Sequence, residues 1–374
     1  MYKILTLVGT RPELIKMCRV ISALDKNFNH ILAHSGQNYD YELNKIFFKN
    51  LKIRKPDYFL NVKDKRLSKL IGNIIEKSDY ILEKERPDAL LIYGDTNTSL
   101  AIICAKRRKI PIFHMEAGNR CFDQRVPEEI NRKIADHLSD INLVLTEQAR
   151  QNLLLEGIKS NTIFKTGSHM KEVFDYYKKD ILDSKILKKI NVKPKNYFLV
   201  SLHREENVDD KKNLKLIIKN LAELAKKFKK KIILSTHPRT RIKLKKSNLL
   251  NNKNILFFKP FGFFDYNFLQ INSFCTISDS GTIFEEASIL NFPAVTIRNS
   301  HERPEGIETG SVIVSGLNQN NIKNSVSIAI NNFDESKKNL VKDYEINNVS
   351  INIVKIITSY INFVNEKTWY KKNN

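Results

Sequence analysis

Short apolar runs of strand length alternate along this chain with longer polar and apolar stretches of helical period. One of the latter extends from Leu67 to Glu83, where apolar residues recur every three or four positions. Alternation of this kind predicts parallel β-sheets with helices on both faces, and so an α/β fold. The runs that we predict as strands are Ile4–Val8, Ala89–Tyr93, Ile110–His114, Ile141–Leu145, Phe198–Leu202, Ile232–Ser235 and Cys275–Ser278.

The alternation occurs twice, which predicts two similar domains in tandem. One series ends near residue 165 and the next begins near residue 195. The 374 residues suit two domains of ordinary size. We expect an N-terminal domain over 1–168, a C-terminal domain over 169–350 and a last segment over 351–374. Ligands of such sheets bind beyond the carboxyl ends of the strands, so we expect a cleft there between the two domains.

The charge balance suggests a polyanionic partner, but the placement of the charges does not. The chain carries 63 Lys and Arg against 41 Asp and Glu, a formal net charge of +22. Such an excess is common in nucleic-acid-binding proteins. The densest lysine runs, at 226–231 and 243–246, lie at the end of a predicted helix and in a polar connection. We therefore interpret them as solvated surface.

The cysteines and the apolar runs exclude several other classes. Cys18, Cys104, Cys121 and Cys275 form no Cys-x-x-Cys pair, which argues against a zinc ribbon or a dithiol redox site. We expect four reduced thiols, as in a reducing compartment. No apolar run approaches the roughly 20 residues that a membrane helix needs. The sequence thus predicts a cytoplasmic protein.

The first predicted strand leads directly into a helix start with cationic side chains. Thr10 and Glu13 have the spacing of a capping box, and Pro12 falls in the first turn. A helix N-terminus offers free N–H groups to an anion, and Arg11 and Lys16 add full charges there. By itself the segment fits an ordinary turn with two solvated cations equally well.

Acidic side chains follow three successive elements of the first half. Asp95 and Glu116 each come at the end of a strand, and Glu128 or Glu129 falls in the first turn of a helix. Taken singly, Asp95 is more simply a helix cap, and the glutamates are favourable charges at a helix N-terminus. Taken together, they predict acid and base groups acting on opposite faces of one carbon.

The second half places anion-binding groups after its strands. His203 and Arg204 follow one strand, a pair suited to binding a phosphate or protonating a leaving group. The turn Ser280–Thr282 precedes a helix and offers backbone N–H groups to a diphosphate. Glu286 lies one turn later, where a carboxylate can accept from ribose hydroxyls. Arg303 belongs to the last polar segment of this series, His301–Gly306.

The order of these motifs resembles that of the non-hydrolysing UDP-N-acetylglucosamine 2-epimerase family. The resemblance implies the glycosyltransferase-B architecture, in which two Rossmann-like domains enclose a deep cleft. It also implies a C-terminal helix, here Ile351–Trp369, that crosses back to the first domain. The matching blocks are Gly9–Lys16, Gly94–Leu100, His114–Arg120, Pro127–Arg132, Leu202–Asn207, Ser278–Ala287 and His301–Gly306.

Further blocks resemble the branch of this family that makes UDP-N-acetyl-L-fucosamine. They are Ser35–Glu42, Arg54–Asn61, Glu116–Glu129, Ser201–Asp209 and Ser235–Arg241. The implied reaction inverts C2 of UDP-2-acetamido-2,6-dideoxy-β-L-talose in capsule or O-antigen precursor synthesis. The alternatives are the UDP-GlcNAc/UDP-ManNAc pair and the UDP-N-acetyl-L-rhamnosamine/quinovosamine pair. Gln37–Asp40 differ from the Gln-His-Arg-Glu of the GlcNAc enzymes, so the resemblance does not imply their allosteric control by UDP-GlcNAc.

The resemblance also implies a mechanism, because the C2 hydrogen of an amido sugar is not acidic. A base removes it as UDP leaves C1, and UDP then adds back to the 2-acetamidoglycal while a proton reaches the other face of C2. Acid/base roles fall to Asp95, Glu116 and Glu128, and His203 assists the leaving phosphate. Arg11, Lys16, Ser280, Gly281, Thr282 and Arg303 hold phosphates and sugar, Tyr266 packs on the uracil and Glu286 accepts from the ribose. No cofactor, metal, nucleic acid or membrane partner is implied, and the expected assembly is a homodimer.

Three other functions compete with this interpretation. A glycosyltransferase of the same architecture requires an acceptor site and does not require three acids. A hydrolysing epimerase releases free sugar and UDP. A basic nucleic-acid-binding protein binds DNA or RNA in a salt-sensitive way, and little beyond the net charge favours it.

Overall fold

The chain divides into two compact units, each built around one sheet. The computed structural model describes residues 1–36, 48, 50–202, 204–236, 238–298, 300–334, 336 and 340–371. Unit 1 is Met1–Val173 with Asp343–Asn374, and unit 2 is Phe174–Lys342. The predicted boundaries were 168 and 350. Among the described helices, none is both long and apolar enough to cross a membrane.

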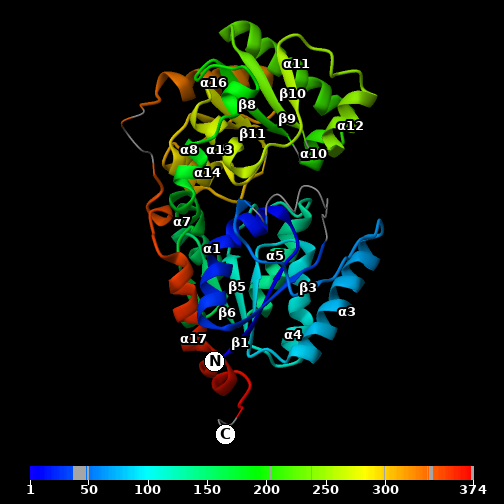
Figure 1. Cartoon of the computed structure of the whole chain (residues 1–374), viewed down its shortest axis with the longest axis vertical. Helices are drawn as coiled ribbons and strands as arrows, with labels where there is room; N and C mark the ends of the chain where they lie inside the picture. Colours follow the sequence, from blue (N-terminus) through cyan, green and yellow to red (C-terminus); the bar gives the residue numbers. More distant parts are fainter. Residues whose placement is uncertain are drawn as a thin grey trace. The chain divides into compact units, whose positions relative to one another are not determined.

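Unit 1 contains a seven-stranded parallel sheet in the order β3-β2-β1-β4-β5-β6-β7 (Figure 1). This is the order of a doubly wound sheet, in which the chain changes direction between β1 and β4. All five residues of β4 are buried, as expected for a parallel strand covered on both faces. The strands are β1 Lys3–Val8, β2 Asn29–His34, β3 Tyr58–Phe59, β4 Ala89–Tyr93, β5 Ile112–Ala117, β6 Ile141–Val144 and β7 Ile163–Lys165.

Helices cover both faces of this sheet. Apolar residues of α3, α4 and α5 form one core with Leu5 and Leu7 of β1. On the other side α1 lies along α17, the last helix of the chain (Figure 1). The helices of unit 1 are α1 Arg11–Asn27, α3 Leu67–Glu85, η1 Asn97–Ala101, α4 Ile102–Arg107, α5 Pro127–Leu138, α6 Glu147–Leu155, η2 Ser160–Thr162 and α17 Val349–Lys367; α7 His169–Tyr176 and η3 Lys342–Tyr344 lie at the unit boundaries.

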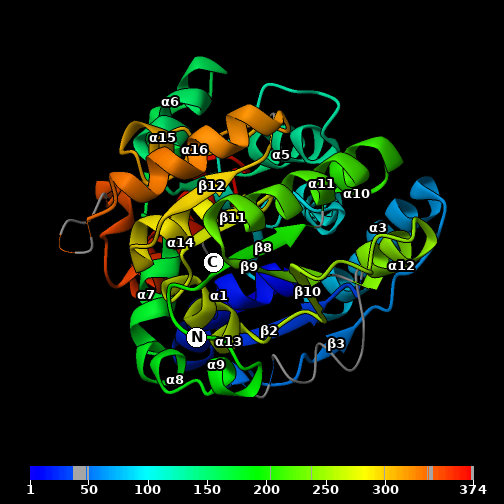
Figure 2. The same ribbon diagram turned by 90° about the horizontal axis from the view of Figure 1, so that it is seen from above.

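Unit 2 repeats the plan with six parallel strands in the order β10-β9-β8-β11-β12-β13 (Figure 2). Phe198 and Val200 of β8 pack with α11 and α16, whereas Tyr197 and Leu199 pack with α9 and α13 on the other face. The strands are β8 Tyr197–Leu202, β9 Lys231–Thr236, β10 Ile255–Phe258, β11 Cys275–Ser278, β12 Ala294–Thr296 and β13 Ile313–Val314. The helices are α8 Lys178–Leu182, α9 Ile186–Lys189, α10 Glu205–Val208, α11 Lys211–Phe228, α12 Pro238–Lys246, α13 Phe263–Ile271, α14 Ile283–Leu290, α15 Glu305–Glu308 and α16 Gln319–Asn331.

The two parallel sheets confirm the predicted α/β fold. One of the predicted strands differs from the observed strand by more than one residue at its ends. We expected a strand over Ile110–His114, but β5 covers Ile112–Ala117. The backbone N–H of Ile110 still bonds to the carbonyl of Ala105 in the preceding turn, which delays the start of the strand. At the other end the strand continues past Glu116 through a register shift, so this residue lies within β5.

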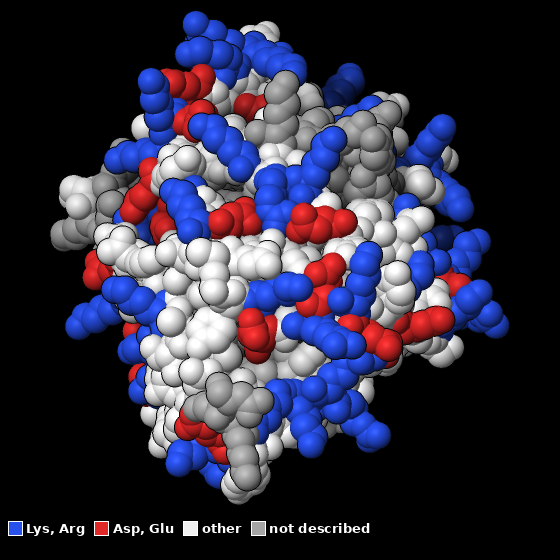
Figure 3. Space-filling view, turned by 60° about the horizontal axis from the view of Figure 1, so that its bottom comes forward, with Lys and Arg blue, Asp and Glu red and all other residues white. Residues whose placement is uncertain are grey.

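The cysteines are reduced thiols as predicted, and the charges on one face of the molecule are mixed. All four cysteines are free thiols. On the face seen in Figure 3, lysine and arginine side chains are scattered among acidic and uncharged ones rather than gathered into one continuous patch. This is the distribution expected of a solvated surface.

Candidate active site

The turn between β1 and α1 buries a carboxylate. Thr10 caps α1 by accepting from the backbone N–H of Glu13, as the capping-box spacing predicts. The Glu13 side chain turns back, and its Oε2 accepts from the backbone N–H of Gly9 at 2.6 Å while its Oε1 lies 3.1 Å from Thr10 Oγ1. Only glycine fits at position 9, because a Cβ there would lie 2.0 Å from Thr98 Oγ1.

Glu13 is also a titratable group near neutrality. Its side chain is buried, and burial raises its pKa to about 7 although the N–H of Gly9 opposes the shift. The charge of Asp95 raises the pKa of Glu13 further, so the turns after β1 and β4 are electrostatically linked. These two strands flank the point where the sheet changes direction, which is where ligands of doubly wound sheets bind.

Asp95 follows β4 and is held by an arginine of α5. The Nη2 and Nε atoms of Arg132 lie 2.5 and 3.1 Å from Asp95 Oδ2. The Asp95 side chain is 23% exposed, so it is held in place and still reaches solvent. The amide of Asn131 supports the same turn by donating to the Asp95 carbonyl at 3.0 Å.

The two glutamates at the start of α5 have different surroundings. Glu129 is buried, pairs with Arg132 Nη1 at 2.5 Å and accepts from the backbone N–H groups of Cys121 and Phe122. It therefore anchors the loop that precedes the helix. Glu128 is half-buried, and no hydrogen bond or ion pair joins its carboxylate to another described residue. The two side chains therefore differ, since that of Glu129 is held by its neighbours.

Glu116 is the most constrained of the predicted acids. Its φ of 62° is unusual for a residue other than glycine and accompanies the register shift in β5. Its Oε2 lies 2.6 Å from Lys16 Nζ of α1 and also accepts from the hydroxyl of Tyr93 at the end of β4. Both Lys16 and Glu116 side chains are more than nine-tenths buried. Strained backbone and a buried ion pair at a strand end are typical of functional sites.

A buried network fixes the strand end that carries Glu116. His114 Nε2 bonds to the carbonyl of Gly94 at 2.9 Å, and its Nδ1 lies 2.8 Å from Asp136 Oδ1. Asp136 also accepts from the N–H of Gly118 and from Arg120 Nη1 at 2.6 Å. The network thus joins β4, β5 and α5 beneath the turns that carry Asp95 and Glu116.

In unit 2 a compact turn follows β11. The Ser280 N–H donates to Ser278 Oγ at 3.0 Å, and Thr282 Oγ1 lies 2.9 Å from Ser280 Oγ. Thr282 also donates to Glu286 Oε1 at 2.8 Å, and Gln270 Nε2 donates to the other oxygen of Glu286 at 2.6 Å. Glu286 is therefore oriented one turn into the helix, as the sequence predicts for a group that accepts from a hydroxyl.

Charged side chains pack directly beneath this turn. Arg303 is buried, and its guanidinium lies 3.1 Å from Glu285 and 3.3 Å from Glu302. A Cβ on Gly281 would lie 2.5 Å from Glu302 Oε1 and 3.3 Å from Arg303 Nη1, so this position admits only glycine without a shift.

The remaining predicted residues stand apart from these contacts. Arg11 is the half-buried first residue of α1, and Tyr266 lies half-buried in α13 against the core beside β8. His203 and Gln37–Asp40 lie outside the described residues. Arg204 follows His203 in the chain, and its backbone N–H donates to a carboxylate oxygen of the buried Asp279 at 3.1 Å. This hydrogen bond joins the turn after β8 to the turn after β11.

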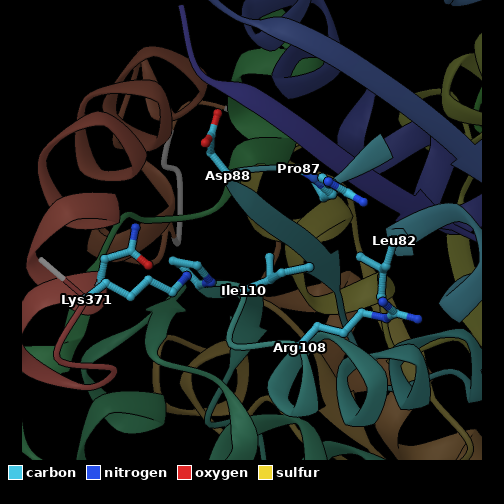
Figure 4. Close-up of a pocket in the computed structure, with 9 residues that line it drawn as sticks. Leu82, Pro87, Asp88, Arg108, Ile110 and Lys371 are labelled. Atoms are coloured by element: carbon cyan, nitrogen blue, oxygen red, sulfur yellow. The ribbon is translucent and has the colours of Figure 1, made fainter. Parts of the chain in front are cut away.

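A hollow of about 320 Å³ lies elsewhere in unit 1, beside the residues that precede β4 (Figure 4). Arg108 there is held by Asp79 at 2.5 Å, and Lys371 donates to the carbonyl of Lys109 at 2.7 Å. None of the predicted site residues lines it. The lining residues are Leu82, Arg86, Pro87, Asp88, Arg108, Ile110, Pro111, Asn365 and Lys371.

Four residues around these turns, Glu13, Tyr93, Arg132 and Asp279, are not among the residues predicted for the site. Arg132 had a detectable signal, because it lies one helical turn after Glu128 and Glu129 and so projects from the same side of α5. Glu13 was visible only as half of a capping box. Nothing in the sequence separates Tyr93 from the other buried residues of its strand.

Comparisons with known proteins show the family to which this chain belongs. A family model described as UDP-N-acetylglucosamine 2-epimerase matches residues 22–358. The chain is 37% identical over 377 residues to the UDP-N-acetylglucosamine 2-epimerase of Methanocaldococcus jannaschii, covering 95% of this chain and 99% of that protein.

Solved structures show the same relationship. UDP-N-acetylglucosamine 2-epimerase from Rickettsia bellii is 53% identical with a TM-score of 0.93, covering 99% of this chain and 100% of the other. The M. jannaschii enzyme in complex with UDP-GlcNAc and UDP is 37% identical with a TM-score of 0.88, covering 96% and 99%. A glycosyltransferase from Rickettsia africae, at 14% identity and a TM-score of 0.56 over 98% of each chain, shares the fold alone. The chain therefore belongs to the UDP-N-acetylglucosamine 2-epimerase family and is a UDP-sugar 2-epimerase, an isomerase.

Proposed function

We propose that this enzyme interconverts UDP-GlcNAc and UDP-ManNAc by elimination and re-addition of UDP. The observation that carries the proposal is the group of carboxylates at the carboxyl edge of the unit 1 sheet. Asp95 and Glu116 are each oriented there by a cation. This substrate pair, an alternative in the sequence analysis, is favoured over the L-talose substrate because the relatives named above are UDP-N-acetylglucosamine 2-epimerases.

In the proposed reaction a carboxylate takes the proton from C2, the C1–O bond to UDP breaks and a C1=C2 double bond forms. UDP then adds back to C1 while a second acid delivers a proton to the opposite face of C2. Asp95, Glu116 and Glu128 supply these acid and base groups. Carboxylates held at fixed positions suit this chemistry, because a group that transfers a proton must lie within hydrogen-bond distance of the atom that gives or receives it.

The departing diphosphate needs a positive environment. We assign it to the turn of Ser280, Gly281 and Thr282, since a turn before a helix is a favourable anion site. Arg303 supports that turn from beneath, and Arg11 and Lys16 add charge at the start of α1. His203 remains the candidate that assists the leaving phosphate.

The nucleoside contacts and the assembly are further predictions. Tyr266 packs on the uracil, and Glu286 accepts from the ribose, for which its orientation by Thr282 and Gln270 is suitable. The working enzyme is a homodimer without an obligatory cofactor.

UDP-2-acetamido-2,6-dideoxy-β-L-talose is the second candidate substrate. The block Glu116–Glu129 favours it, because this sequence resembles that of the L-fucosamine branch. In the structure the loop between β5 and α5, which lies within this block, is anchored by Glu129. A capsule or O-antigen precursor role would follow from this substrate.

Proton NMR of the reaction in heavy water tests the proposal and separates the substrates. Purified enzyme is incubated with UDP-GlcNAc or the L-talose sugar alone, and we expect deuterium at C2 and appearance of the C2 epimer. Glu116→Gln and Asp95→Asn are expected to lower turnover by ~10²-fold or more with UDP binding retained. Absence of both deuterium and epimer from every substrate contradicts the proposal, and free sugar with UDP identifies a hydrolase instead.

A further inference from the structure

Oε2 of Glu116 receives two hydrogen-bond donors. Lys16 Nζ lies 2.6 Å from it, and the hydroxyl of Tyr93 bonds to the same oxygen. The ammonium group also lies 5.2 Å from the centre of the Tyr93 ring, so cation, phenol and carboxylate form one compact group. Tyr93 is 4% exposed, which keeps water from competing for these bonds.

A buried histidine extends this group. His169, the first residue of α7, is fully buried, and its Nε2 lies 3.3 Å from the Tyr93 hydroxyl oxygen. The two rings meet edge to face at 5.2 Å. A carboxylate only accepts, so the single phenol proton of Tyr93 points to Glu116. The phenol oxygen then accepts from Nε2–H of His169, so among the described residues a chain of donors runs from His169 through Tyr93 to Oε2.

This direction determines which oxygen of Glu116 exchanges a proton. Oε2 faces the hydrogens of Lys16 and Tyr93, so a proton taken up by the carboxyl group is accommodated on Oε1. Oε1 lies towards Gly94, 3.9 Å from where a Cβ of that residue would be. Gly94 has φ 65° and leads into Asp95, so Oε1 faces the turn that carries the second acid.

We propose that Tyr93 and His169 are positioning residues which, together with Lys16, direct the exchangeable proton of Glu116 to Oε1. The proposal rests on the acid/base role of Glu116 in the proposed function. Tyr93 and His169 act through Glu116 and touch no reacting atom in this scheme. Among the residues that the structure describes, the charged and titratable groups around Glu116 are Lys16 from α1, Tyr93 from β4 and His169 from α7, with Glu13, Asp95 and Arg132 further along the same sheet edge.

Tyr93→Phe tests the proposal, because it removes one donor and keeps the ring. Loss of a hydrogen bond to the charged form moves a carboxylate titration upward, so we expect the acid limb of the kcat/KM profile to rise by about one pH unit. At neutral pH kcat should fall by about tenfold with KM nearly unchanged. Tyr197→Phe is the matched control, since Tyr197 is a buried tyrosine of β8 that donates to the Leu269 carbonyl at 2.7 Å. Its pH profile should match that of the wild type.

His169 provides a second, independent variant. His169→Gln keeps an N–H group near the position of Nε2 and should retain the wild-type profile. His169→Leu removes that donor and should shift the profile in the same direction as Tyr93→Phe, by a smaller amount. If the glutamine and leucine variants behave alike, His169 has only a packing role and this part of the proposal is wrong.

A measurement without substrate keeps this proposal separate from the proposed function. Carbon NMR of ¹³Cδ-glutamate-labelled protein follows the titration of Glu116, whose signal is identified by its loss in Glu116→Gln. We expect the titration midpoint to move upward by about one pH unit in Tyr93→Phe and not in Tyr197→Phe. An unchanged midpoint overturns the proposal even in an active epimerase. A shifted midpoint in a protein that epimerises no UDP-sugar supports the hydrogen-bond chain and contradicts the proposed function.

Discussion

Glu13→Gln is expected to stabilise unit 1 above neutral pH. Burial raises the pKa of Glu13 from 4.5 to about 7. Between these values the folded state holds a proton that the unfolded state has released, so the free energy of unfolding falls as pH rises. Above pH 7 the wild type keeps a charge in a buried site, whereas glutamine is neutral at every pH. The amide oxygen of glutamine can still accept from the Gly9 N–H that Glu13 now holds at 2.6 Å.

The magnitude follows from the size of the shift. At about 1.4 kcal/mol per pKa unit, the loss in the wild type between pH 4.5 and pH 7 is ~3 kcal/mol. Glu13→Gln should escape this loss and exceed the wild type by ~2–3 kcal/mol at pH 8, less any weakening of its hydrogen bonds. At pH 4.5 the two proteins should have nearly equal stability, because Glu13 of the wild type is protonated in the folded state and largely protonated in the unfolded state.

Urea unfolding at pH 5 and pH 8 measures this difference. Trp369 is the only tryptophan of the chain and belongs to unit 1, so its fluorescence follows the unit that contains Glu13. Glu156→Gln is a control of opposite sign, because its bonds to Arg120 lower the pKa of Glu156 to about 2. That contribution is present above pH 4.5, so the control should be less stable at pH 8. A Glu13→Gln protein that is less stable than the wild type at pH 8, or a difference that does not vary with pH, would refute the reasoning.

Two further substitutions probe the proposed site. Arg132→Met leaves Asp95 and the buried Glu129 without their cation, so we expect the free energy of unfolding of unit 1, measured in urea, to fall by ~3–5 kcal/mol. Arg132→Lys should lower it by less. Equal stability of the methionine variant and the wild type would contradict this expectation. Gly281→Ala brings a Cβ to 2.5 Å from Glu302 Oε1, and the shifted turn should weaken UDP binding by about tenfold in calorimetry. An unchanged Kd for UDP would show that this turn does not hold the diphosphate.

Much of the architecture was predictable because it depends on local pattern. Buried parallel strands are continuous apolar runs, and the motifs that follow them were located within a few residues of their observed positions. The capping of α1 by Thr10 is confirmed, and so is the start of α5 at Pro127. The end of β5 was not predictable, since an extended run and a run with a bulge at Glu116 have the same sequence pattern.

The distinction between Glu128 and Glu129 shows the limit of sequence spacing. Both fall in the first turn of α5, and both are compatible with a favourable charge at a helix N-terminus. Only the packing of the preceding loop shows that Glu129 accepts from the Cys121 and Phe122 N–H groups. One glutamate is therefore committed to structure, and its neighbour is not.

The sequence by itself determined the alternation of strands and helices in two series and the polar residues that follow each predicted strand. These depend on hydrophobic period and turn chemistry, which act over a few residues. Only the tertiary structure decided which side chains meet. Lys16 pairs with Glu116 across 100 residues of chain, and Arg132 pairs with Asp95 across 37. Parallel strands joined by helical crossovers bring such distant strand ends to one edge of the sheet. Because the side chains there are buried, they form ion pairs and influence each other's protonation.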